Sequence, residues 1–237
     1  MKPDDWVILD NSDMVNAGYF AAEDRIVEQS RMSIAREARS VERLLVLTEG
    51  SSDSRILKET LDVLYPHLRE FVSFLDHGQF SVAGGTGNLM NLLRGLAGAG
   101  VSNRVVALFD NDAAGTVQRN KAQMMPLPEN FRVIQLPRLQ RAERYPALGP
   151  TGLVETDING LACSIELYLG STALQDGQAG LMPIQWTGFE HSLSGYQGEL
   201  LEKKRVQDRY FALLRAGRAD TSDMAAVFAH ILRSFHD

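Results

Sequence analysis

Two aspartates, Asp110 and Asp112, stand directly after the most apolar short run of the sequence, residues 104–109. Side chains alternate along an extended chain, so a strand that ends in this pattern would direct both carboxylates away from the sheet edge. Two like charges this close repel each other unless one is protonated or a cation lies between them. A hard divalent cation with oxygen ligands is the natural partner. The alternative is a solvated turn in which Asp112 caps the next helix.

A second pair of acids, Glu49 and Asp53, spans a predicted strand-to-helix turn. Glu49 and Gly50 follow the apolar run at residues 43–48, and Asp53 lies in the first turn of the predicted helix. Four residues across such a turn can place both carboxylates near one point. The helix macrodipole alone favours an acid in the first turn, which would explain Asp53. It does not explain Glu49, which directly abuts an apolar run.

The third feature is a glycine-rich turn formed by Gly84, Gly85, Thr86 and Gly87 ahead of a predicted helix. Backbone N–H groups at a helix start can cradle a phosphate, so these glycines and Gly50 are candidate phosphate-binding or backbone-turn residues. The same sequence would equally serve as a tight turn without a ligand. It is not a P-loop, because no Gly-Lys-Ser/Thr follows.

The elements that carry these residues alternate between strand and helix. The predicted strands cover residues 43–48, 71–75, 80–83, 104–109 and 131–136, and the predicted helices follow Gly50 and cover 89–97 and 117–124. This alternation is typical of an α/β protein with a Rossmann-like, mostly parallel sheet flanked by helices. Ligands bind at the carboxyl ends of the strands in such sheets. We therefore expect the acidic and glycine-rich turns to meet at one edge.

The rest of the chain is predicted to be helical. Residues 1–40 form an N-terminal helical segment with one amphipathic helix over 13–38, and residues 41–137 form the α/β core. Residues 138–237 form a C-terminal helical extension that completes the site. Turns and a loop rich in Gly and Gln come first, a helix that reaches Leu214 follows, and a last helix covers 223–235.

The composition limits the class of protein to which the chain can belong. Hydrophobic residues make up 44% and charged residues 23% of the 237 residues, values of a globular protein rather than a disordered or fibrous one. No apolar run reaches the roughly 18 residues of a membrane span. The acidic N-terminus differs from a secretory signal, so we expect a cytoplasmic protein with no membrane partner. The net charge of −6 argues against a protein that coats nucleic acid by bulk charge, but not against an enzyme that acts on it.

Metal chemistry, where present, must come from carboxylates. The single cysteine, Cys163, excludes a disulfide framework and a cysteine-built zinc site, and we expect it to be a small buried hydrophobe. The five histidines lack the close spacing of a histidine-built metal site. Carboxylate ligands favour Mg²⁺ or Mn²⁺.

Taken together, these motifs resemble the Toprim domain, the catalytic module shared by topoisomerases, primases and a class of nucleases. The matching pattern is an apolar strand that ends in Glu49-Gly50, a glycine turn, and a strand that ends in Asp110-Asn-Asp112. The chain is most similar to the OLD-type (OLD family) nucleases and to the Toprim modules found with HEPN domains. There the first motif reads Glu-Gly-x-x-Asp/Glu, which here ends at Asp53. The resemblance covers roughly residues 42–137 and is looser downstream.

The resemblance implies a metal site and a catalytic lysine. The implied metal ligands are Glu49, Asp53, Asp110, Asp112 and Glu166. The implied catalytic residues are Glu49, Asp110, Asp112 and a downstream lysine, Lys203 or Lys204. The alternative for Glu166 is a partly buried acid paired with an arginine of segment 138–144, and the alternative for the lysines is a solvated helix face. Arg138, Arg141 and Arg144 are candidate nucleic-acid contacts or a plain basic surface.

The expected function is therefore a divalent-metal-dependent nuclease, with DNA favoured over RNA as substrate. The resemblance also suggests an effector subunit of a prokaryotic antiviral defence system. An ATPase or other effector would be a separate partner protein, because this chain has no Walker motif, and self-association is left open. The alternative is a non-catalytic Toprim subunit that binds a metal or a nucleotide for a larger complex. A haloacid-dehalogenase-type phosphatase fits poorly, because Thr116 lies two places too late for that motif.

Overall fold

The computed structural model describes residues 10–21, 23–41, 43–75, 84–177 and 180–236. The chain divides into two compact units, Met1–Val41 and Glu42–Asp237. The first contains α1 (Ser12–Asn16) and α2 (Ile26–Val41). The prediction of one continuous helix over 13–38 is wrong. Gly18 adopts a left-handed φ of +78°, which glycine tolerates and a continuing helix does not, and α1 ends before it.

The second unit is built on a four-stranded parallel sheet with the strand order β2-β1-β3-β5. Its strands are β1 (Leu44–Leu47), β2 (Val72–Phe74), β3 (Val105–Phe109) and β5 (Phe131–Gln135). The parallel sheet predicted from the apolar runs is thus confirmed for these four strands. The strand predicted at 80–83 lies outside the described residues.

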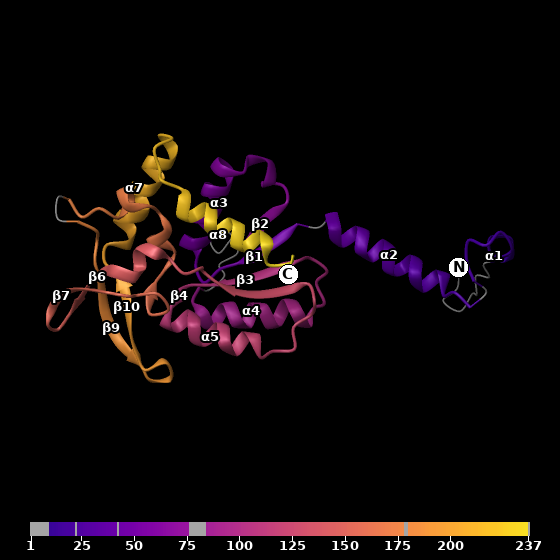
Figure 1. Cartoon of the computed structure of the whole chain (residues 1–237), viewed down its shortest axis with the longest axis horizontal. Helices are drawn as coiled ribbons and strands as arrows, with labels where there is room; N and C mark the ends of the chain where they lie inside the picture. Colours follow the sequence, from indigo (N-terminus) through magenta and orange to yellow (C-terminus); the bar gives the residue numbers. More distant parts are fainter. Residues whose placement is uncertain (1–9, 22, 42, 76–83, 178–179, 237) are drawn as a thin grey trace. The chain divides into compact units, whose positions relative to one another are not determined.

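Helices cover both faces of this sheet, as Figure 1 shows. They are α3 (Ser51–Leu64), α4 (Thr86–Gly98), α5 (Ala113–Gln123) and α8 (Ser222–Arg233). Successive residues of β3 enter two separate apolar cores: Val106 packs in the core shared with α3 and α8, and Ala107 in the core shared with α4 and α5. Helix α5 begins four residues earlier than predicted, because Asp112 accepts a hydrogen bond from Gly115 N–H at 2.6 Å and so caps it.

A second four-stranded sheet, with the order β10-β9-β6-β7, follows β5. Its strands are β6 (Tyr145–Gly149), β7 (Gly152–Thr156), β9 (Ile184–Glu190) and β10 (Gly195–Leu200). The prediction of a helical C-terminal extension is therefore wrong over this stretch. These strands could not be recognised from the sequence, because they are not continuous apolar runs. In β9, for instance, Ile184 is the one buried residue.

Short elements connect the two sheets. Strand β4 (Asn111–Asp112) pairs antiparallel with β8 (Ala162–Cys163) directly after the end of β3. Helix α7 (Lys203–Arg215) lies beyond β10, and a buried hydrogen bond of 2.8 Å between the hydroxyl groups of Thr60 and Tyr210 joins it to α3. The other short helices are η1 (Pro66–Leu68), η2 (Gln140–Arg144), η3 (Ile165–Tyr168), α6 (Ser171–Leu174) and η4 (His191–Leu193). Among the helices described, none is long and apolar enough to cross a membrane.

Candidate active site

Glu49 and Asp110 lie at the carboxyl ends of the two central strands, β1 and β3. From β1 the chain continues outward through α3 to β2, and from β3 it continues in the opposite direction through α5 to β5. Open α/β sheets bind ligands at such a point of divergence. Glu49 Oε1 accepts a hydrogen bond from the Asp110 N–H at 3.1 Å. The structure therefore brings together two acids that are 61 residues apart in sequence.

Asp53 lies in the first turn of α3, with its carboxylate turned back to the preceding loop. Its Oδ2 accepts a hydrogen bond from Gly50 N–H at 2.9 Å, and its Oδ1 accepts one from Ser52 Oγ at 3.1 Å. Asp53 thus stabilises the start of α3 through the Gly50 N–H, in addition to the macrodipole interaction that the sequence allowed. The charge of Glu166 also acts on it and raises its pKa, so it belongs to the acid cluster as well.

The glycine turn is fastened to the same strand end. Gly85 N–H donates to the Glu49 carbonyl at 2.6 Å, and a Cβ added to Gly84 would lie 3.1 Å from that carbonyl oxygen. Gly85 has a φ of +98°, a conformation that side-chain-bearing residues rarely adopt. Helix α4 starts at Thr86, and a Cβ on Gly87 would meet open space. These contacts give the turn a structural role beside Glu49.

Glu166 lies in η3 with only 3% of its surface exposed. Its Oε2 accepts a hydrogen bond from Ser164 Oγ and its Oε1 accepts one from Gln207 Nε2, both at 2.7 Å. Within the described part of the chain it makes no ion pair with an arginine, which was the alternative considered for it. Instead, its negative charge raises the pKa of both Asp53 and Asp110. Glu166 is therefore electrostatically coupled to the acids of the central strands.

The two candidate lysines differ sharply in position, although they are adjacent. Burial alone would lower the pKa of Lys203, but the charges of Glu166, Glu199 and the two aspartates after β3 raise it above its ordinary value. Lys204 has 81% of its side chain exposed and pairs with Asp208 at 2.9 Å on the surface of α7. Lys203 is therefore the lysine that belongs to the cluster.

Burial, together with the charges of the acids on one another, raises the pKa of these carboxyl groups. Burial, followed by the charges of Asp112 and Asp53, raises the pKa of Glu49 to about 8, against the opposing hydrogen bond from Asp110. Burial and Glu166 raise the pKa of Asp53 to about 7. Burial and four neighbouring carboxylates raise the pKa of Asp110 well above its usual value. Such mutual shifts are typical of functional sites, where like charges are held together by the fold.

The three arginines of segment 138–144 each lie beside an acid elsewhere. Arg138 pairs with Asp157 at 2.9 Å, Arg141 with Asp223 at 2.7 Å and Arg144 with Glu155 at 3.0 Å. Arg141 also donates to the carbonyl of Leu167, the residue after Glu166. Arg141 is mostly buried in its ion pair and has a structural role, whereas Arg138 and Arg144 are exposed and pair with exposed acids.

Two residues near the cluster were not predicted. Glu199 on β10 raises the pKa of Asp112 and of Lys203, and Gln207 donates to Glu166. Gln207 lies one helical turn after Lys203, so the spacing of four residues is a signal that could have identified it. Glu199 lies four residues before Lys203, in the stretch from Tyr196 over which the motif resemblance extends loosely, but that stretch alone assigns it no role.

The donor set fits a hard divalent cation, since carboxylate oxygens are what Mg²⁺ and Mn²⁺ prefer. Within the described residues, however, no three acidic, histidine or cysteine side chains stand in an arrangement that could hold a metal ion. The acids thus act on one another electrostatically while remaining too dispersed to form a closed ligand shell.

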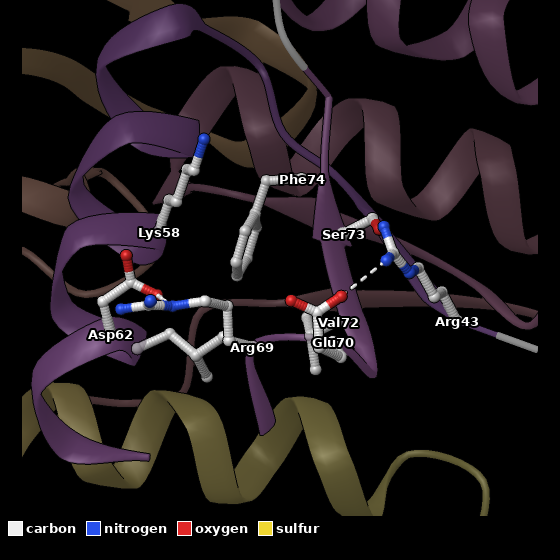
Figure 2. Close-up of a pocket in the computed structure, with 9 residues that line it drawn as sticks. Arg43, Lys58, Asp62, Arg69, Glu70, Val72, Ser73 and Phe74 are labelled. Carbon is white, nitrogen blue, oxygen red and sulfur yellow. Dashed lines mark hydrogen bonds and ion pairs between the residues drawn. The ribbon is translucent and has the colours of Figure 1, made fainter. Parts of the chain in front are cut away.

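A separate hollow of about 270 Å³ lies along β2, away from these acids. Figure 2 shows its lining residues: Arg43, Lys58, Leu61, Asp62, Arg69, Glu70, Val72, Ser73 and Phe74. Arg43 pairs with Glu70 at 2.7 Å and Arg69 pairs with Asp62 at 2.6 Å. These charges offset each other, and none of the predicted site residues lines the hollow.

Comparison with known proteins adds no assignment: no family model, no curated protein and no solved structure matches this chain.

Proposed function

We propose that the protein is a divalent-metal-dependent nuclease that hydrolyses phosphodiester bonds of nucleic acid, with DNA as the favoured substrate. One observation carries the proposal. Acids from three separate parts of the sequence, together with Lys203, act on one another at the carboxyl ends of β1 and β3. A protein gains no stability from crowding like charges, so this arrangement favours a role in binding a cation. The motif resemblance to Toprim nucleases points to the same chemistry.

Each acid has a role in this proposal. The described acids do not stand in a metal-holding arrangement, so cation binding would have to draw them together. Glu49, Asp110 and Asp112 would then hold one Mg²⁺ or Mn²⁺, and Asp53 and Glu166 would help to hold a second. When bound, such ions lower the pKa of a water molecule and neutralise the charge of the phosphate. The hydrogen bonds from Asp110 to Glu49, from Gly115 to Asp112 and from Gln207 to Glu166 fix how these carboxylates are presented.

Lys203 suits the stabilisation of negative charge rather than proton abstraction. Its raised pKa keeps it protonated at neutral pH, so it would offer a fixed positive charge beside a phosphate. Preorganised charges of this kind usually contribute most when charge develops in the transition state. Lys204, which is exposed and paired with Asp208, has no equivalent role.

The test is a cleavage assay with plasmid DNA, linear DNA and RNA, in EDTA and with Mg²⁺ or Mn²⁺. We expect metal-dependent cleavage that falls at least about 100-fold in Lys203→Met, the scale of losing one transition-state donor. Lys204→Met is the matched control, because the same substitution one residue on removes only a surface ion pair. Asp110→Asn and Asp112→Asn should abolish Mn²⁺ binding measured by calorimetry.

The same assay distinguishes a nuclease from the alternative, a non-catalytic metal-binding subunit. A protein that binds Mn²⁺ through Asp110 yet cuts none of the substrates would be a non-catalytic metal-binding subunit. Equal activity in Lys203→Met and Lys204→Met would remove Lys203 from the mechanism. The proposed defence role and the need for a separate ATPase would be tested by adding candidate partner proteins to the same assay.

A further inference from the structure

Asn111 lies between the two aspartates and is buried, with only 5% of its surface exposed. Because side chains alternate along β4, its amide faces away from the carboxylate of Asp112. A primary amide buried this deeply requires hydrogen-bond partners at both its oxygen and its nitrogen. The identity of these partners shows whether Asn111 has a role beyond packing.

All partners of the Asn111 amide belong to the later half of the chain. Its Oδ1 accepts a hydrogen bond from Gly160 N–H at 2.8 Å. Its Nδ2 donates to Asn159 Oδ1 at 2.9 Å and to the Tyr168 hydroxyl at 3.4 Å. The amide therefore links the turn that carries the aspartates to a segment about fifty residues downstream.

That segment is itself held firmly. Asn159 Oδ1 accepts from Leu139 N–H at 2.9 Å, and Asn159 Nδ2 donates back to the Leu139 carbonyl at 3.2 Å. The Tyr168 hydroxyl donates to the carbonyl of Pro137. Tyr168 belongs to η3, the short helix that carries Glu166. A single network of hydrogen bonds thus connects the turn that carries Asp110 and Asp112 with the short helix that carries Glu166.

We propose that Asn111 is a positioning residue for metal binding, and that its amide holds Asp110 and Asp112 in place against the segment that carries Glu166. This inference rests on the proposed function. Residues that hydrogen-bond around metal ligands fix the orientation of those ligands, and their loss typically costs about 10- to 100-fold in metal affinity. A purely structural amide would lower stability and leave affinity unchanged.

The experiment is a calorimetric Mn²⁺ titration of the metal-free full-length protein and its variants. Asn111→Ala and Asn159→Ala should each weaken Mn²⁺ binding by about 10- to 100-fold. The double variant should bind no more weakly than Asn111→Ala, because that substitution already removes the bond to Asn159 together with those to Gly160 and Tyr168. Should Asn111→Ala fail to fold, Asn159→Ala decides the question, because its side chain lies outside the acid turn.

Asn130→Ala is the matched control. Asn130 Nδ2 donates to the carbonyls of Val101 and Asn103 at 2.8 and 2.7 Å, at the amino ends of the strands. It is an equally bonded amide far along the strands from the acids, so its loss should lower stability and leave Mn²⁺ affinity within about twofold.

The outcomes separate this inference from the proposed function. Wild-type affinity in Asn111→Ala, together with lost binding in Asp110→Asn, would overturn the role of Asn111 and leave the metal site standing. An equal loss in Asn111→Ala and Asn130→Ala would reduce the effect to general destabilisation and also overturn it. A wild-type protein that binds no Mn²⁺ would overturn both proposals.

Discussion

Without a bound cation, the acid cluster should make the protein less stable as the pH rises. The pKa of Glu49 is raised from an ordinary 4.5 to about 8, and that of Asp53 from 3.8 to about 7. Between the ordinary and the raised values the folded protein holds protons that the unfolded chain has released. Stability from such groups is fully present below the ordinary pKa and is lost as the pH rises through the folded one.

The size of this effect follows from the same shifts. Each carboxyl that keeps its proton only in the folded state lowers the free energy of unfolding by about 1.4 kcal/mol per pH unit. Glu49 should therefore contribute a falling slope between about pH 5 and pH 8. Glu49→Gln removes that slope but keeps an oxygen that can accept from Asp110 N–H, so it should be more stable than wild type at pH 7.5 by roughly 2–4 kcal/mol.

The assay is urea unfolding in EDTA, followed by tryptophan fluorescence at half-unit steps from pH 5 to pH 8.5. The measured quantity is the difference in unfolding free energy between wild type and Glu49→Gln, which cancels the titration of histidines. Glu155→Gln, at an exposed ion pair on β7, is the control and should leave the slope unchanged. A difference between wild type and Glu49→Gln that stays flat across this range would refute the reasoning, and saturating Mg²⁺ should diminish the slope.

Four further predictions concern other parts of the fold. A Cβ on Gly115 would lie 2.2 Å from the Asp110 carbonyl oxygen, so Gly115→Ala should destabilise the protein by at least about 2 kcal/mol in urea unfolding. Gly95→Ala, where a Cβ meets open space within α4, should instead stabilise it by about 0.5–1 kcal/mol. Burial raises the pKa of Cys163 to about 12, so a thiol reagent at pH 8 should label it only after urea unfolds the chain; labelling of the native protein would contradict its burial. Tyr210→Phe removes a buried hydrogen bond between α3 and α7 and should cost about 1–2 kcal/mol, and unchanged stability would show that the bond contributes little.

The first sheet could be predicted from sequence because buried parallel strands appear as continuous apolar runs. All five residues of β3 are buried, and the run at 104–109 shows it directly. The second sheet could not be predicted in this way, because none of its strands is buried along its whole length. In β9 only Trp186 and Glu190 are half-buried after Ile184 and the other residues are exposed, a pattern that also suits a loop.

The candidate site, too, could be predicted from the sequence only in part. Glu49 and Asp110 follow adjacent apolar strands, and parallel strands carry their carboxyl ends to one edge, so local sequence suffices to bring them together. Glu166 and Lys203 reach that edge only through the packing of η3 and α7, which no local pattern specifies. The choice between Lys203 and Lys204 depends on a rotation of about 100° around a helix whose orientation the sequence leaves open.

The hydrogen bond between Thr60 and Tyr210 joins residues 150 positions apart, so it can form only late in the synthesis of the chain. The acids after β1 and β3 leave the ribosome first, whereas Lys203 and α7 follow about ninety residues after Asp112. A nascent chain that has emerged through β5 therefore holds clustered negative charges without the lysine, without Glu166 and without the contact that fastens α7 to α3. Its apolar strands can begin to pair, since domains generally fold as they emerge. The complete set of acids and Lys203 is present only after α7 has been synthesised, so the proposed hydrolytic activity would arise late in translation.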